Sequence, residues 1–246
     1  MKTKENRCRI CIYILGLIIL ALGLTLNTKA GLGVSPIISI AYAAFELTGY
    51  NFGNTTFAEY SVFVVIEIVL LCIRWRKQKK AQDEALQNAK KADSRMILLM
   101  DVLQLPLSLV FTRFLNLFSK LIPNVQTDGK DTAAALGIKL AVLALALILT
   151  GIGAALSLNM RIVPNPGDGI VQAISDFIHK SVGFTKNCVD ITCVITTVVV
   201  CLLCGGKIYG VGIGTIIAMV AVGRIIAVFN HFTKKKLIQV TGLEES

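Results

Sequence analysis

Leu26-Asn27-Thr28-Lys29 ends the first apolar run of the chain, and Gly31-Leu32-Gly33-Val34-Ser35-Pro36 interrupts the sequence directly after it. A similar pair of stretches recurs later, where Leu158-Asn159-Met160-Arg161 is followed by Val163-Pro164-Asn165-Pro166-Gly167-Asp168-Gly169. Each interruption opens an apolar segment that is too short to cross a bilayer, such as Pro36–Leu47. Paired interruptions of this kind are typical of a substrate pathway between two inverted halves of a membrane protein.

The composition also indicates a membrane protein. Of the 246 residues, 54% are hydrophobic and only 16% are charged, whereas a soluble domain carries about 25% charged residues. Six apolar runs approach the roughly 20 residues that a spanning helix needs. They are Ile10–Leu26, Phe57–Trp75, Met96–Phe118, Leu140–Leu158, Cys188–Cys204 and Tyr209–Phe229. We therefore predict an all-α polytopic membrane protein with six transmembrane helices and two short half-helices.

The positions of the basic residues predict the orientation in the membrane. Most of the 25 Lys and Arg residues lie in the N-terminus (1–9), a basic linker (76–95), the segment after the fourth span and the tail (230–246). These segments are expected in the cytoplasm, and the loop 119–139 outside, because positive charge accumulates on the inner side. This distribution also argues that the net charge of +10 does not indicate nucleic-acid binding.

The same rule decides how the short segments lie. If they crossed the membrane, the basic linker would face outward, against the charge rule. If they re-enter without crossing, the first unit (10–118) and the second unit (140–229) each have three spans. An odd number of spans inverts the second unit relative to the first. The sequence therefore predicts an inverted 3+3 repeat with one half-helix per unit, entering from opposite faces.

The pattern of an Asn-ended first helix, a Gly-rich break, a short helix and a later Gly-x-Gly-Thr helix resembles the YitT/YczE family of bacterial membrane proteins. The likeness is carried by Pro166-Gly167-Asp168-Gly169 and Gly212-Ile213-Gly214-Thr215 and covers most of residues 10–230. The resemblance implies a multi-pass protein of the bacterial inner membrane with a duplicated unit. It implies no established substrate, because the family is usually designated an uncharacterised one.

Five polar residues are the candidates for substrate binding: Asn27, Ser35, Glu67, Asn159 and Asp168. The two asparagines end the broken helices, where an amide either caps exposed carbonyls or donates to a ligand. Ser35 and Asp168 stand at the starts of the short helices, where free N–H groups attract anions. Asp168 is equally consistent with a helix cap or a preference for a cation.

Glu67 lies near the middle of the second span, where an ionisable side chain is costly and faces a cavity or a partner. It is either a structural acid paired with Arg113 or Arg224, or an acid that couples transport to protons or cations. Glu59 and Asp190, which correspond in the two units, lie near span ends and are interpreted as interfacial acids or as partners of a helix N-terminal dipole. The two arginines are expected to reach the membrane interfaces.

Two further sequence features have structural interpretations. The glycines Gly210, Gly212 and Gly214 are interpreted as sites of close helix packing. Cys8-x-x-Cys11 and Cys201-x-x-Cys204 resemble two halves of a zinc site, but the predicted topology puts them on opposite faces. No metal and no cofactor is therefore expected.

An enzyme is not expected either. The sequence has no Walker sequence, no His-Glu-x-x-His and no Gly-x-Ser-x-Gly motif, and only two histidines. The favoured function is a secondary transporter or channel for a small polar or ionic solute, with its site between the two units. The alternative is a membrane scaffold or sensor that docks a cytoplasmic partner through linker 76–95. The lipid bilayer and a solute are the expected partners, nucleic acid is not, and the sequence leaves open a homo-oligomer.

Overall fold

The computed structural model describes the backbone of residues 2–79, 84–125 and 133–242, and the side chains of residues 5–76, 96–125 and 133–242. These parts are helical apart from short connections and contain no strand. The helices are α1 (Lys2–Lys29), η1 (Pro36–Ile38), α2 (Ser39–Thr48), α3 (Phe52–Lys79), α4 (Glu84–Leu121), α5 (Ala133–Asn159), α6 (Pro166–Ile178), α7 (Val182–Cys204) and α8 (Ile213–Thr241). Much of linker 76–95 and part of loop 119–139 lie outside the described residues.

Six of these helices are long and apolar enough to cross a membrane: α1, α3, α4, α5, α7 and α8. Each corresponds to one of the apolar runs identified in the sequence, and all but α8 contain the whole run, so the all-α class and the six long apolar helices are confirmed. The helices extend beyond the apolar runs, because hydropathy marks the part suited to lipid and not the ends of the helix. The chain is thus built as a polytopic membrane protein.

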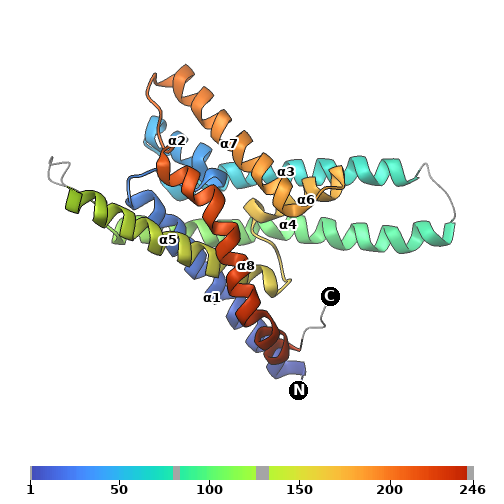
Figure 1. Ribbon diagram of the computed structural model, residues 1–246. Coiled ribbons are helices and arrows are strands. Elements are labelled where there is room, and N and C mark those ends of the chain that lie inside the picture. The colour runs from blue at the N-terminus through green and yellow to red at the C-terminus, as the bar shows by residue number, and fades with distance from the viewer. Residues whose placement is uncertain (1, 80–83, 126–132, 243–246) are drawn as a thin grey trace.

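The start of the last span differs from the prediction. The sequence places it at Tyr209, whereas α8 begins at Ile213. Gly206 and Gly210 adopt positive φ angles of 64° and 76°, which end regular helix and are readily adopted only by glycine. Residues 205–212 therefore form an irregular connection between α7 and α8 (Figure 1).

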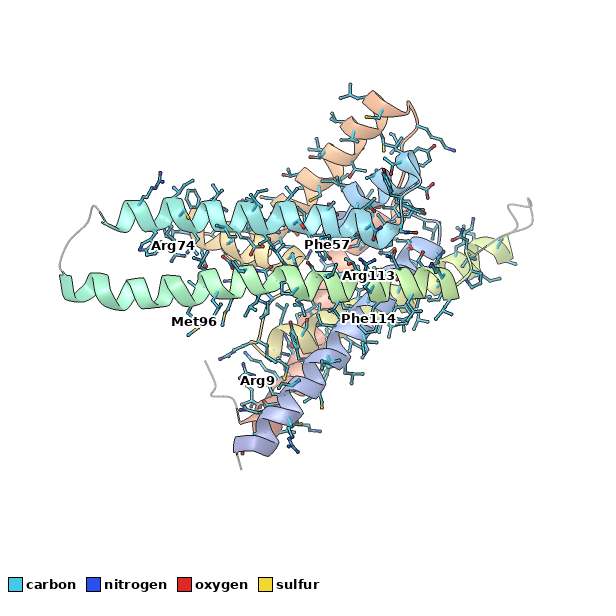
Figure 2. The ribbon with its side chains drawn as sticks, turned by 180° about the vertical axis from the view of Figure 1, so that it is seen from behind. Arg9, Phe57, Arg74, Met96, Arg113 and Phe114 are labelled. Carbon is cyan, nitrogen blue, oxygen red and sulfur yellow. The ribbon has the colours of Figure 1, made fainter. Side chains whose placement is uncertain are left out.

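Two packed groups of long helices make up the molecule. In the first, α1 lies along α5, and α5 lies along α8. In the second, α3 and α4 form an antiparallel pair, seen from behind in Figure 2. The start of α1 and the end of α8 lie at the same end of the molecule, because a Cβ at Gly242 would lie 2.9 Å from Glu5 Oε2. The buried apolar core joins both groups through side chains such as Leu20, Tyr60, Phe111 and Met160.

The first interruption is held by hydrogen bonds from two helices. With its amide turned so that the nitrogen faces Gly33 O, Asn27 at the end of α1 donates to that oxygen and accepts from Ser35 N, both at 3.1 Å. The start of α8 supplies a second contact, because Gly214 N donates to Leu32 O at 2.7 Å. Backbone groups that lipid could not satisfy are thereby satisfied inside the protein.

Gly212 and Gly214 therefore have a different role from the predicted one, whereas Gly210 does face a neighbouring helix, through Tyr42 of α2. A Cβ at Gly212 would lie within 2.4 Å of Leu32 O, and one at Gly214 within 2.9 Å of the same atom. Their close contact is with the irregular backbone of the first interruption and not with a neighbouring helix, which corrects the interpretation as helix packing.

The second interruption is held mainly by α1. Arg9 donates through Nε to Met160 O and through Nη2 to Arg161 O, each at 2.7 Å. Tyr13 donates its hydroxyl to Val163 O at 2.7 Å. The start of one unit therefore fixes the break in the other.

The two short helices lie against opposite ends of α3. Tyr42 and Phe45 of α2 contact the Phe52 ring at the start of α3. By contrast, α6 faces the second half of α3, around Leu70 and Arg74. Figure 1 shows the same separation of α2 and α6 along α3.

Candidate functional site

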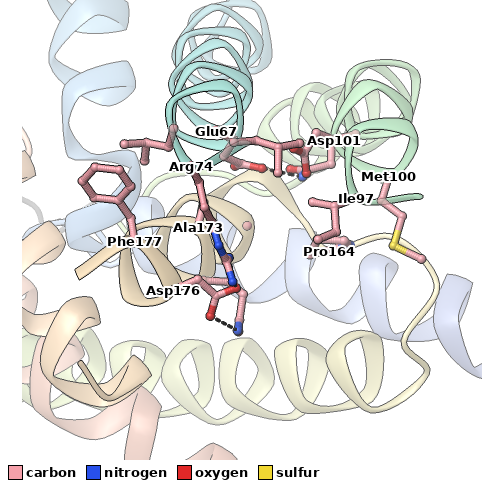
Figure 3. A pocket seen from close by; sticks show the side chains of 14 residues that line it. Glu67, Arg74, Ile97, Met100, Asp101, Pro164, Ala173, Asp176 and Phe177 are labelled. Atoms are coloured by element: carbon pink, nitrogen blue, oxygen red, sulfur yellow. Dashed lines mark hydrogen bonds and ion pairs between the residues drawn. The ribbon is translucent and has the colours of Figure 1, made fainter. Parts of the chain in front are cut away.

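A cavity of about 210 Å³ lies between α3, α4 and α6 (Figure 3). This space is left open because α6 begins only at Pro166. Pro164 and Pro166 keep the residues before them out of a helix. Pro166 occupies the first turn of α6, where the missing N–H costs nothing. The first two turns of α6 then present Gly169 and Ala173, two small residues, to the cavity.

Glu67 is the central polar group of this cavity. The residue is 2% exposed, and its Oε2 accepts a hydrogen bond of 2.6 Å from Nε2 of Gln104 on α4. Glu67 Oε1 and Gln104 Oε1 are buried and have no hydrogen-bond partner. Buried acceptors without a donor are costly in a protein interior. The cavity thus holds two oxygens that a donor or a cation would satisfy.

Gly169 allows these oxygens to approach the backbone of α6. A Cβ at this position would lie 2.8 Å from both Glu67 Oε1 and Gln104 Oε1. Any other residue would fill the space in front of the two acceptors. Glycine at the first turn of α6 is therefore a steric requirement of the cavity.

The rest of the lining divides into a second acid, an ion pair and apolar walls. Asp101 of α4 is 7% exposed and lies beside Glu67 in Figure 3. Arg74 and Asp176 form an ion pair at 3.6 Å across the exposed rim, between α3 and α6. Apolar walls surround these groups: Leu70, Leu71, Ile97, Met100 and Phe177.

A second hollow, of about 440 Å³, lies at the first interruption. It is lined by residues 31–34, by Tyr42 and Glu46 of α2, and by the connection 208–213 before α8. It therefore adjoins the short helix of the first unit, as the Glu67 cavity adjoins the short helix of the second.

The starts of the two short helices meet between these spaces. The nearest side-chain carbon of Ile37, in η1, would lie 3.2 Å from a Cβ at Gly167, in α6. Ser39 and Thr197 share a hydrogen bond of 2.7 Å that joins α2 to α7. Asn165 donates to the Tyr60 hydroxyl at 3.3 Å, joining the start of α6 to α3.

Glu59 and Asp190 are buried and not interfacial, which corrects the interpretation from sequence. Glu59 is 8% exposed with both carboxyl oxygens lacking a hydrogen-bond partner, and Asp190 is 0% exposed. Asp190 is paired with Lys186 at 3.0 Å, one turn away on α7. Asp168 of α6 lies in the electrostatic field of both members of this pair. Both acids lie near a helix end in the sequence, but their side chains are not exposed, because α2 and α6 cover them.

The five predicted site residues do not come together at one place. Glu67 lines the cavity, whereas Asn27 and Ser35 bind each other at the first interruption. Asn159 donates to Asn230 Oδ1 of α8 at 2.7 Å. Asp168 lies in the first turn of α6, one residue before Gly169.

The arginines considered as partners of Glu67 lie elsewhere. Arg113 is exposed on α4 and donates to Asn54 Oδ1 at 3.4 Å (Figure 2). Arg224 is exposed on α8. Glu67 pairs instead with Gln104, which the sequence interpretation did not include in the site.

Asp101, Gln104, Gly169 and Arg74 are the functional candidates that sequence reasoning missed. Asp101 and Gln104 are three residues apart in an apolar run and so share one face of a helix. That spacing is the signal that identifies them. No comparable spacing identifies Arg74 or Gly169 as cavity residues, because their place in the cavity depends on which helices pack together.

Comparison with known proteins places the chain in a family. A family model described as a family of unknown function (DUF6198) matches residues 7–88 and 89–231. The match covers most of the sequence, and the chain belongs to this family. The searches of curated proteins and of solved structures gave no match. The predicted resemblance to the YitT/YczE family is not confirmed by these comparisons and stays a prediction.

Proposed function

We propose that this integral membrane protein is a secondary transporter or channel for a small polar or ionic solute. The observation that carries the proposal is Glu67, a buried carboxyl group with an oxygen that has no partner, in a cavity against the start of a short helix. An intramembrane acid of this kind is costly and is retained where it binds or moves something.

The arrangement of the helices supports an inverted repeat of two units. Unit one would comprise α1, α2, α3 and α4, and unit two α5, α6, α7 and α8. Each short helix packs on the corresponding long helices of both units, because α2 and α6 each contact α3 and α7. Matching contacts of this kind are expected if a twofold axis relates the units.

The two hollows support alternating access. They adjoin different short helices, and the contact of Ile37 with α6 lies between the starts of these helices. In the proposed orientation, both termini and linker 76–95 face the cytoplasm of a bacterial cell. The Glu67 cavity then opens inward and the hollow at Glu46 opens outward. Rocking of one unit against the other would exchange access to the site.

The proposed activity involves no covalent chemistry and no cofactor. Energy for uphill movement would come from an ion gradient or from a separate ATPase subunit. Asn27, Ser35 and Asn159 are assigned to holding the interruptions, and Glu67 to the solute. Asp168 is assigned to the partly buried cluster with Asp190 and Lys186.

Solute-dependent charge movement in proteoliposomes tests the proposal. The full chain is reconstituted and exposed to panels of amines, amino acids, carboxylates, sugars and inorganic ions on a solid-supported membrane. At least one class is expected to give a saturable signal that Glu67→Gln reduces at least tenfold. Glu5→Gln, which changes an acid at the start of α1 outside both hollows, is the matched control and should retain the signal.

The scaffold alternative makes the opposite prediction. It rests on linker 76–95, of which residues 77–95 have side chains outside the described residues. No response to any panel, together with loss of the cellular phenotype on deletion of this linker but not in Glu67→Gln, would replace the transport proposal by the scaffold.

A further inference from the structure

We infer that the cavity between α3, α4 and α6 takes a small organic monocation with an ammonium group and a short apolar chain. The inference rests on the proposed function and names the class of solute. Three properties of the cavity lead to it: two hydrogen-bond acceptors without a donor, an excess of carboxyl groups in the lining, and apolar walls.

The two acceptors without a donor lie close together. Glu67 Oε1 and Gln104 Oε1 both pack against the backbone of Gly169, since each would lie 2.8 Å from a Cβ there, and a ligand would reach them from the side of the cavity. Both oxygens are buried and lack a partner. An ammonium group carries three N–H donors and no acceptor, so it can satisfy both oxygens at once. A carboxylate or a phosphate would offer them only acceptors.

The charge of the lining also favours a cation. Three carboxyl groups line the cavity, those of Glu67, Asp101 and Asp176, against the single guanidinium of Arg74. Arg74 is already paired with Asp176 at the rim. The two carboxyl groups of α3 and α4 are left without an opposite charge, and a buried charge is stable only when it is paired.

The walls decide between an inorganic and an organic cation. Apart from the polar groups, the cavity is lined by aliphatic and aromatic side chains, including Leu71, Ile97 and Phe177. A hydrated inorganic ion would leave these surfaces in contact with water, whereas an alkyl chain would bury them at about 25 cal/mol per Å². The volume of about 210 Å³ suits a short chain.

Ligand binding to the cavity is measured through the fluorescence of the single tryptophan. Trp75 is the only tryptophan of the chain and follows Arg74, which lies at the cavity rim. The full chain in lipid nanodiscs is titrated with n-butylammonium, and the fluorescence of Trp75 is followed. n-Butanol and butyrate test the need for the positive charge, and Mg²⁺ tests the inorganic alternative. We expect saturable binding of n-butylammonium at least tenfold tighter than that of the other three probes.

Variants assign the binding to the cavity. Glu67→Gln is expected to weaken n-butylammonium binding at least tenfold, while Glu5→Gln, outside both hollows, leaves it unchanged. Ala173→Leu fills the cavity and keeps every polar group, so it should abolish binding even if Glu67→Gln does not fold. Equal or tighter binding of butyrate, n-butanol or Mg²⁺ overturns the inference, as does undiminished binding in Ala173→Leu.

Failure of the inference and failure of the proposed function give different results. If n-butylammonium binds as expected but no amine crosses the membrane in proteoliposomes, the site is correct and transport is wrong. If a different class of solute gives the Glu67-dependent signal, transport is correct and the cation is wrong.

Discussion

At Gly169, the addition of a single methyl group should weaken ligand binding without preventing folding. Its Cβ would lie 2.8 Å from Glu67 Oε1 and from Gln104 Oε1, which are the ends of long side chains. These ends can move by a few tenths of an ångström, so we expect Gly169→Ala to fold. The displaced acceptors should weaken n-butylammonium binding about tenfold, equivalent to about 1.4 kcal/mol, as measured by Trp75 fluorescence.

Gly183→Ala is the matched control, because a Cβ there meets no atom within 4 Å. It should bind like the unmodified protein. Equal binding by Gly169→Ala would show that the space above this glycine is not where the ligand lies.

Glu59 and Asp190 occupy corresponding positions in the two proposed units but should respond oppositely to mutation. Glu59 has no partner for either carboxyl oxygen, whereas Asp190 is paired with Lys186. Glu59→Met removes an unsatisfied buried group, worth about 1–3 kcal/mol. The midpoint of thermal unfolding should rise by roughly 2–4 °C per kcal/mol. Asp190→Asn leaves Lys186 without its carboxylate and should lower the midpoint. A fall in both variants, in detergent at one pH, would mean that Glu59 has a stabilising partner.

The helices show which structural features a sequence can predict. The six long helices and two short ones follow from local properties: runs of apolar residues, and the glycines and prolines that interrupt them. The roles of Glu67 and Gly210 to Gly214 depend on neighbours that are distant in sequence. Glu67 meets Gln104 because α3 and α4 pair, and Gly214 meets Leu32 because α8 starts beside the first interruption. Hydropathy contains no information on those contacts.

The pair α1 and α5 depends on glycines for its close approach. A Cβ at Gly153 would lie 2.4 Å from Leu20 N, and one at Gly23 would lie 2.5 Å from Thr150 N. Small residues at such crossings let membrane helices pack backbone to backbone. Gly153→Ala should therefore destabilise the protein by about 1–3 kcal/mol through overpacking, measured as a lower midpoint of thermal unfolding.

Gly137→Ala lies on the same helix and provides the comparison. A Cβ there meets nothing within 4 Å, and alanine is a better helix former than glycine by about 1 kcal/mol. This variant should be neutral or slightly more stable. If both variants behave alike, helix propensity and not the crossing of α1 with α5 decides stability at Gly153.

At the scale of the whole molecule, the two proposed units share one kind of contact and differ in another. Each short helix, α2 or α6, packs on both α3 and α7. The pairing of α3 with α4 is extensive, whereas α7 and α8 touch little. Gln104 reaches Glu67 across the first of these pairs. The close pair thus lines the Glu67 cavity, whereas the loose pair lies within the second proposed unit.

The opposite placement of the two short helices is the property on which alternating access depends. Tyr50 follows α2 and is 68% exposed, and Lys180 follows α6 and is also exposed. Single-cysteine variants Tyr50→Cys and Lys180→Cys, made in a chain whose seven cysteines are replaced by serine, report the side on which each helix ends. Tyr50→Cys should react with a membrane-impermeant maleimide in right-side-out vesicles, and Lys180→Cys only in inverted ones. Lys207→Cys and Lys235→Cys are the reference positions for the outer and inner side. Reaction of both test positions in the same vesicles would place α2 and α6 on one side, and the two hollows could then not serve opposite faces of the membrane.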